Sequence, residues 1–137
     1  NVIGNYIVGL PEDDLASMEE TYQLAAELNT EFMNVYSAMA YPGSALYDRA
    51  VAGGWTLPDQ WAGYSQHNEH CRPLDTKHVS AAEVLRFRDT FFDRYYARPE
   101  YVDMIRAKFG EVAVDEVRKM TTYKLKRNLL GVVECTT

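Results

Sequence analysis

The order of apolar and polar positions predicts two units in which a strand leads through a loop into a helix. β-Branched and aromatic residues crowd positions 2–8, and this run stops at Gly9, before Pro11 and three carboxylates. A second run, 31–39, stops at the Pro-Gly pair 42–43. Each run precedes a stretch with apolar residues at helical spacing. Because parallel strands need helical crossovers, this order indicates an α/β fold with a parallel sheet.

Capping residues set the ends of the expected helices in this first part. Asp13 or Asp14 can begin a helix that stops near Asn29, and Ser44 can begin a short helix that ends at 53–54, a Gly-Gly pair. The first expected strand is apolar on both faces, and the second is apolar apart from Asn34 and Ser37. This is typical of parallel strands that helices cover on each side.

The second half of the chain has only helical periodicity. Ser80 and Glu83 form a capping box for a helix through about Ala97, whose aromatic face we expect to pack over the sheet rather than to stack a cofactor. Pro99 begins a helix to Gly110. The last predicted helix runs from Glu111 to Leu130, with an apolar stripe at Val114, Val117, Met120, Leu125 and Leu129.

These elements divide the chain into two predicted parts. Residues 1–79 are expected to form part of a (β/α) barrel, with two parallel β-α units and a long loop over 54–79. Residues 80–137 are expected to form a C-terminal helical extension. The chain does not begin with Met and opens inside an expected strand, so we expect it to be a piece of a longer protein.

Composition and charge narrow the classes of function. The chain is 47% hydrophobic with a net charge of −6, and it has no basic stripe free of acids, which argues against nucleic-acid binding. No apolar run suits a membrane span or a signal peptide, so we expect a cytoplasmic protein. The basic residues of the tail are predicted to lie on a solvated helix face: Lys108, Arg118, Lys119, Lys124, Lys126 and Arg127.

The histidines and cysteines form no strong motif. Cys71 and Cys135 are far apart, which indicates a reducing compartment rather than a disulfide framework. His67, His70, Cys71 and His78 are residue types that bind zinc, but their spacing matches no established zinc pattern. We predict a polar loop here and no metal site. A zinc-dependent hydrolase is the weaker alternative.

The loop after the first strand is the main candidate for ligand binding. Gly9 lacks a Cβ and allows a ligand to approach the backbone closely. The following carboxylates, Glu12 among them, would repel a phosphate but suit ribose hydroxyls, an ammonium group or an adenine edge. The pattern equally fits a turn glycine followed by acids that cap a helix.

The motifs in their order resemble the radical S-adenosylmethionine (SAM) superfamily. Ile7, Gly9 and Glu12 resemble the signature of its fifth strand, although the leading Gly of that signature falls at Asn5. The segment 42–55, with Pro-Gly-Ser, a Tyr and then Gly-Gly-Trp, resembles a second motif. The remainder is similar to the subgroup with a B12-binding domain, which includes the anaerobic Mg-protoporphyrin IX monomethyl ester oxidative cyclases.

This resemblance implies a cofactor site and a parent enzyme. Ile7 would pack against the adenine of SAM, Gly9 would give clearance, and Glu12 would lie near that pocket. The parent would cleave SAM at a [4Fe-4S] cluster, with cobalamin as a further cofactor of the subgroup. It would methylate, cyclise or oxidise a substrate such as a tetrapyrrole.

The cluster ligands of the superfamily are missing from this sequence. No Cys-x-x-x-Cys-x-x-Cys loop is present, so we expect this chain alone to bind no cofactor, to carry no catalytic residue and to be inactive. Its partner would be the remainder of the parent polypeptide. The alternative is a non-catalytic α+β module for binding or oligomerisation, whose exposed strand edges pair in a homodimer.

Overall fold

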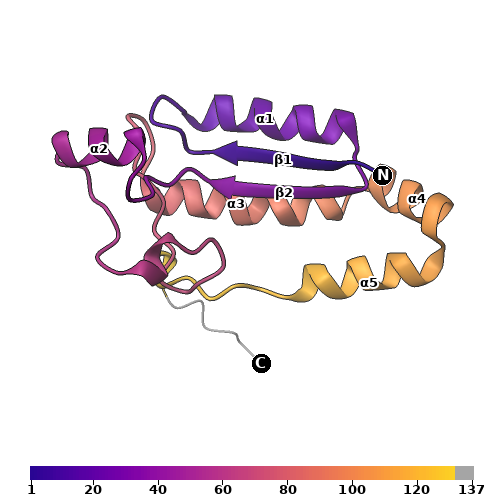
Figure 1. The fold of residues 1–137 in the computed structure, drawn as a ribbon. Helices are drawn as coiled ribbons and strands as arrows, with labels where there is room; N and C mark the ends of the chain where they lie inside the picture. Colours follow the sequence, from indigo (N-terminus) through magenta and orange to yellow (C-terminus); the bar gives the residue numbers. More distant parts are fainter. Residues whose placement is uncertain (132–137) are drawn as a thin grey trace.

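The computed structural model describes residues 1–131, and Cys135 lies outside this range. Two strands and five α-helices are arranged as Figure 1 shows. In chain order the elements are β1 (Ile3–Val8), α1 (Leu15–Leu28), β2 (Phe32–Ser37), α2 (Ala45–Ala52), a 3₁₀ turn (Trp61–Tyr64), α3 (Ala81–Tyr96), α4 (Pro99–Phe109), α5 (Glu111–Thr122) and a second 3₁₀ turn (Asn128–Leu130).

The two strands pair in parallel, from Ile3 opposite Phe32 to Val8 opposite Ser37. A helix follows each strand, and the C-terminal helices complete the chain. The predicted α/β class, with two parallel β-α units before a helical part, is therefore confirmed.

Local capping chemistry places the helix ends where the sequence predicts them. The Asp14 carboxylate accepts a hydrogen bond from the Ser17 N–H at 2.9 Å, and α1 ends at Asn29, which has a left-handed φ of 44°. The Ser44 hydroxyl accepts from the Tyr47 N–H at the start of α2. These helix boundaries need no information from the rest of the fold.

Helices α1 and α3 cover one face of the sheet and form the core with it. Their buried side chains meet the inward residues of the strands, and aromatic rings of α3 lie in the middle of this cluster. The prediction that this aromatic face packs on the sheet is confirmed. The main buried residues are Val8, Met18, Tyr22, Met33, Val35, Phe91, Tyr95 and Tyr96.

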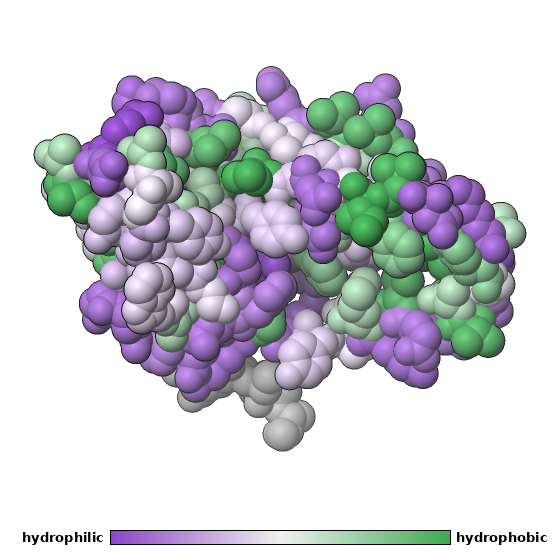
Figure 2. All heavy atoms as spheres, in the orientation of Figure 1, coloured by the Kyte–Doolittle hydropathy of each residue, from purple (hydrophilic) through white to green (hydrophobic). Residues whose placement is uncertain are grey.

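The opposite face of the sheet is not covered, which corrects the expectation of helices on both sides. Ile3, Ile7 and Phe32 expose 57%, 54% and 49% of their surface. Between them, the Asn34 amide donates to the Asn5 side-chain oxygen at 3.1 Å. The difference arises because α1 and α3 lie on the same side of both strands. We call the uncovered side, with Asn5, Asn34, Tyr36 and these apolar residues, the open face; Figure 2 shows hydrophobic side chains over β1 and α1 in this view.

Helix α5 is shorter than predicted, because it ends at Thr122 rather than Leu130. The hydroxyls of Thr121 and Thr122 donate to the carbonyls of Arg118 and Lys119, which favours a helix end. Leu125 and Leu129 therefore do not continue the helical stripe. The chain instead runs back along α3, where Arg127 becomes buried.

One hydrophobic cluster joins both predicted parts of the chain. It contains Val8 and Met33 from residues 1–79, and Phe91, Ile105 and Val114 from the helical part. The division into two domains stays a prediction. None of the helices within residues 1–131 has the length and apolarity that a bilayer crossing requires.

Candidate functional site

Side chains form hydrogen bonds with the backbone N–H and carbonyl groups along the outer edge of β2. The Tyr96 hydroxyl donates to the Met33 carbonyl at 2.7 Å and accepts from the Met33 N–H at 2.9 Å. The Arg88 Nε donates to the Val35 carbonyl at 3.0 Å. These contacts take the place of hydrogen bonds that a further strand would make.

The same pattern continues to both ends of β2. The Gln66 side chain accepts from the Ser37 N–H at 3.0 Å and donates to the Ser37 carbonyl at 2.9 Å. At the other end, the Tyr101 hydroxyl donates to the Glu31 carbonyl. Side chains therefore cover most of this edge, which we call sealed, and a strand beside β2 would have to displace them.

The outer edge of β1 is open. Hydrogen bonds from Phe32 and Ala38 to the carbonyls of Val2 and Val8 fix which residues of β1 face β2. The backbone groups of Ile3, Asn5 and Ile7 point the other way, and no hydrogen bond within residues 1–131 reaches them. A further strand can therefore pair with β1 without displacing any side chain from its backbone. Next to this strand, α1 exposes Leu15, Leu24 and Leu28.

The structure places the three predicted cofactor residues in different surroundings. Ile7 lies on the open face, opposite Tyr36. Gly9 is buried with a φ of 79°, and a Cβ at this position would lie 2.4 Å from Cγ1 of Val84 on α3. Because Gly9 has no side chain, Val84 of α3 can pack directly against the backbone at this position. Of the three, only Ile7 presents its side chain on the open face, and the assignment of all three to an adenine site stays a prediction.

Glu12 lies in a hollow at the carboxyl end of β1. Its carboxylate accepts a hydrogen bond from the Lys77 ammonium at 2.7 Å, and this contact lowers its pKa. The Lys77 N–H also donates to the Pro11 carbonyl, and the guanidinium of Arg49 lies 5.9 Å from the centre of the Trp55 ring. The hollow has a volume of about 400 Å³. Its charges are paired and exposed, which suits a structural role for Glu12.

The histidine-cysteine loop is not gathered into one site. Cys71 is fully buried in a cluster with Met39 and Leu85, and burial raises the pKa of its thiol. The His70 Nδ1 lies 3.1 Å from the Asn128 amide nitrogen, and His78 is exposed. Across the described part of the chain, no group of three His, Cys, Asp or Glu side chains could hold a metal ion.

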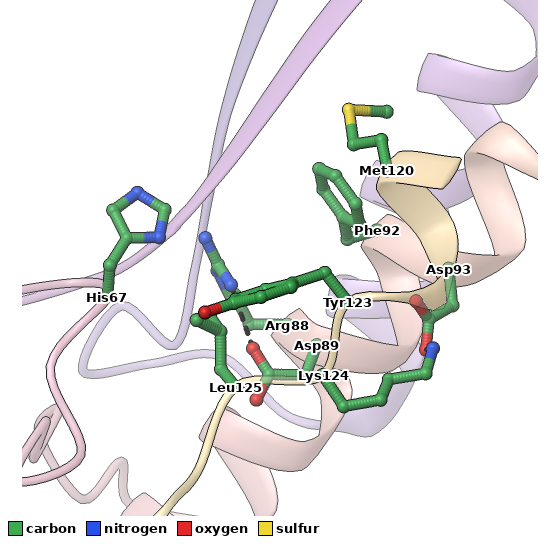
Figure 3. A pocket seen from close by; sticks show the side chains of 9 residues that line it. All are labelled: His67, Arg88, Asp89, Phe92, Asp93, Met120, Tyr123, Lys124 and Leu125. Atoms are coloured by element: carbon green, nitrogen blue, oxygen red, sulfur yellow. Dashed lines mark hydrogen bonds and ion pairs between the residues drawn. The ribbon is translucent and has the colours of Figure 1, made fainter. Parts of the chain in front are cut away.

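A second cavity, of about 380 Å³, lies between α3 and the segment that follows α5 (Figure 3). Asp89, one of its lining residues, accepts hydrogen bonds on both carboxylate oxygens from the guanidinium of Arg127 at 2.9 Å, and Nη1 of Arg127 donates to the carbonyls of Gln66 and Asn68. Arg127 is 4% exposed, so its prediction as part of a solvated helix face is wrong. Leu125 and Leu129, each two residues away from it, were the available sequence signal.

Comparison with known proteins gives one distant similarity. The chain is 23% identical over 100 residues to a protein of Pyrococcus horikoshii described as an uncharacterized methyltransferase. The match covers 73% of this chain and 21% of that protein, so it spans about a fifth of the relative's length. No protein-family model matches the chain, and no solved structure matches it. The similarity is thus to a methyltransferase and is not specific to the radical SAM superfamily.

Proposed function

We propose that this chain is the C-terminal part of a radical SAM enzyme and supplies the last two β-α units of its barrel. The observation that carries this proposal is the asymmetry of the sheet. The outer edge of β1 is open and one face of the sheet is uncovered, whereas the edge of β2 is sealed by Tyr96, Arg88 and Gln66. These features support a sheet that continues before β1 and ends at β2.

The uncovered surfaces lie where preceding β-α units would pack. A further parallel strand would satisfy the outward backbone groups of β1, and its helix would cover the exposed leucines of α1. Curving the enlarged sheet into a partial barrel, left open beside β2, would place the open face on its inner side. The relative is several times longer than the matched segment, which leaves room for such units in a protein of its size. Its description as a methyltransferase agrees with SAM as the cofactor.

The residues on the open face fit one wall of an adenine site. Ile7 and Tyr36 stand opposite each other near the carboxyl end of the strands and offer apolar and aromatic surface to a planar base. The amides of Asn5 and Asn34 offer further hydrogen-bond partners. Bound SAM would supply the transferable methyl group or the adenosyl radical.

The described residues do not fit an iron-sulfur cluster. Cys71 is enclosed by apolar side chains, and burial raises its pKa, so it is not available as a thiolate ligand. We therefore assign the [4Fe-4S] ligands, and any cobalamin site, to the part of the parent polypeptide that would precede β1. The substrate of the parent is expected to be set by the same part.

The whole reading frame tests this proposal. We expect a three-cysteine loop upstream of Asn1, an iron-sulfur absorbance after anaerobic reconstitution, and cleavage of SAM to 5′-deoxyadenosine. Replacing Ile7 with Ala should weaken SAM binding about three- to ten-fold through lost apolar contact. Ile3→Ala, on the same face at the far end of β1, is the matched control and should change it less than about two-fold. A reading frame without the cysteine loop would rule the proposal out.

A non-catalytic oligomerisation module is the second candidate, because the open edge also favours self-pairing. Two copies related by a two-fold axis would join their β1 strands as an antiparallel pair, which would satisfy the outward backbone groups of Ile3, Asn5 and Ile7. Light scattering of the protein across a concentration series tests it. A stable dimer from a reading frame without cluster ligands would favour the module, and a monomer would exclude it.

A further inference from the structure

The cavity between α3 and the segment after α5 contains a buried cation that lacks a full partner. Arg88 is 5% exposed. Its Nε donates to the Val35 carbonyl and its Nη1 to Asp89 at 2.8 Å, while no hydrogen bond from residues 1–131 reaches Nη2. Figure 3 shows this guanidinium among the side chains that line the cavity.

The buried cation of the cavity shares its carboxylate partner with a second cation. Asp89 is shared by two buried guanidiniums, those of Arg88 and Arg127, and Asp93 pairs with Lys124 at 2.7 Å. Asp89 thus serves two buried guanidiniums, of which only Arg88 lines the cavity, so Arg88 has no carboxylate of its own. The Nη2 of Arg88 makes no hydrogen bond within residues 1–131 and is not among the fully enclosed polar atoms, so a second anion in the cavity could reach it and pair with it. His67, at the rim, adds no charge near neutral pH, because partial desolvation and then the nearby arginines lower its pKa.

The walls of the cavity are apolar and partly exposed. The apolar lining residues are Phe92, Met120, Tyr123 and Leu125. Of these, Tyr123 is 80% exposed, so its ring is largely in contact with water when the cavity is empty. The volume of about 380 Å³ falls at the lower end of the range for small-molecule sites and far exceeds the need of an inorganic ion. An occupant would therefore have an organic body.

We propose that this cavity binds a small organic anion, with its carboxylate on Arg88 and its apolar or aromatic body against Phe92, Met120 and Tyr123. Because Nε donates to the Val35 carbonyl and Nη1 to Asp89, Nη2 is the group that remains to donate a charge-assisted hydrogen bond to the carboxylate. The site is separate from the open face, and it does not depend on SAM or on the cluster.

Two probes of matched shape test the contribution of the anionic charge to binding separately from that of the aromatic ring. 2-Naphthoate and 2-naphthamide have nearly the same shape, and only the first is an anion. By titration calorimetry with the protein, we expect one site for 2-naphthoate with a Kd below about 1 mM, and binding of the amide at least about ten-fold weaker. Equal affinity of the two probes, or no saturable binding of naphthoate, would overturn the proposal.

Two substitutions place the binding in this cavity. Met120→Trp should fill the space and weaken naphthoate binding at least about ten-fold. Val112→Trp, on the exposed side of the same helix, should leave it within about two-fold. Arg88→Gln keeps a donor for the Val35 carbonyl but removes the charge, so the preference for the acid over the amide should vanish. If Arg88→Gln does not fold, the comparison of Met120→Trp with Val112→Trp tests whether naphthoate binds in this cavity. Unchanged binding in Met120→Trp would refute the site.

Discussion

At the scale of single residues, Gly9 and Gly43 separate two reasons for a glycine. Both have a positive φ, of 79° and 88°. At Gly43 a Cβ would meet nothing within 4 Å, whereas at Gly9 it would press on Val84 of α3. The backbone conformation thus favours glycine at both positions, and packing demands it at Gly9.

Replacing Gly9 with Ala should lower the free energy of unfolding by about 2–4 kcal/mol, because steric overlap adds to the strain of a positive φ. Gly43→Ala should cost only about 1 kcal/mol, since the strain acts alone there. Urea unfolding of both variants measures the difference. If Val84→Ala restores part of the loss in the Gly9 variant, the overlap with α3 is its source; no recovery would contradict it.

Glu31 gives a prediction for acid stability. The Lys108 ammonium, and next the Val2 N–H at 2.9 Å, lower the pKa of its carboxyl to about 2. The unfolded chain binds this proton more tightly, so the stabilisation is complete above a pH of about 4.5 and is lost as the pH falls toward 2. Urea midpoints between pH 6 and pH 2.5 should therefore fall less steeply in Glu31→Gln. Glu27→Gln, an exposed change on α1, should keep the slope of the parent.

At the scale of elements, the edge of β2 is stabilised by side chains from three separate segments. Gln66 comes from the loop, Arg88 and Tyr96 come from α3, and Tyr101 comes from α4. Each satisfies backbone groups that would otherwise be buried without partners. This arrangement couples the C-terminal helices to the sheet by hydrogen bonds as well as by apolar contact.

Tyr96→Phe tests the sealed edge directly. It leaves the N–H and carbonyl of Met33 without their partner and should cost about 2–4 kcal/mol in the free energy of unfolding. Tyr41→Phe is the control, because no hydrogen bond within residues 1–131 uses the Tyr41 hydroxyl, and it should change stability by less than about 0.5 kcal/mol. Equal effects of the two would show that the edge contacts contribute little.

The sequence predicts the elements better than it predicts their surroundings. Helix starts at Asp14, Ser44 and Ser80 follow from capping chemistry that acts within a few residues. The burial of Arg127 depends on Asp89, which is far away in the chain. The open face could not be read from apolar alternation either, because apolar side chains also line surfaces that another segment would cover.

At the scale of the whole molecule, the two faces of the sheet differ in how far other elements cover them. The α1–α3 side is a finished core, whereas the open face and the outer edge of β1 leave apolar and hydrogen-bonding groups in water. The same contrast underlies the proposed place of the chain in a larger barrel. This contrast predicts that the outward amides of β1 exchange their hydrogens with water faster than those of β2.

Hydrogen exchange would make this difference visible. In the protein as described, the amides of Ile3, Asn5 and Ile7 should exchange quickly, while those of Met33 and Ser37 should be protected by Tyr96 and Gln66. In the product of the whole reading frame, a neighbouring strand should slow the exchange of the β1 amides. Fast exchange of Met33 in the protein alone would contradict the sealed edge.

The sealed edge of β2 also sets a limit on growth by strand addition. A protein with two free sheet edges can polymerise without end, because each new copy offers another template. Here a copy that joins through β1 turns only its blocked side outward, where Tyr96, Arg88 and Gln66 already hold the backbone. A third copy therefore finds no free strand edge, and we expect association along the strands to stop at a pair instead of extending into a fibril.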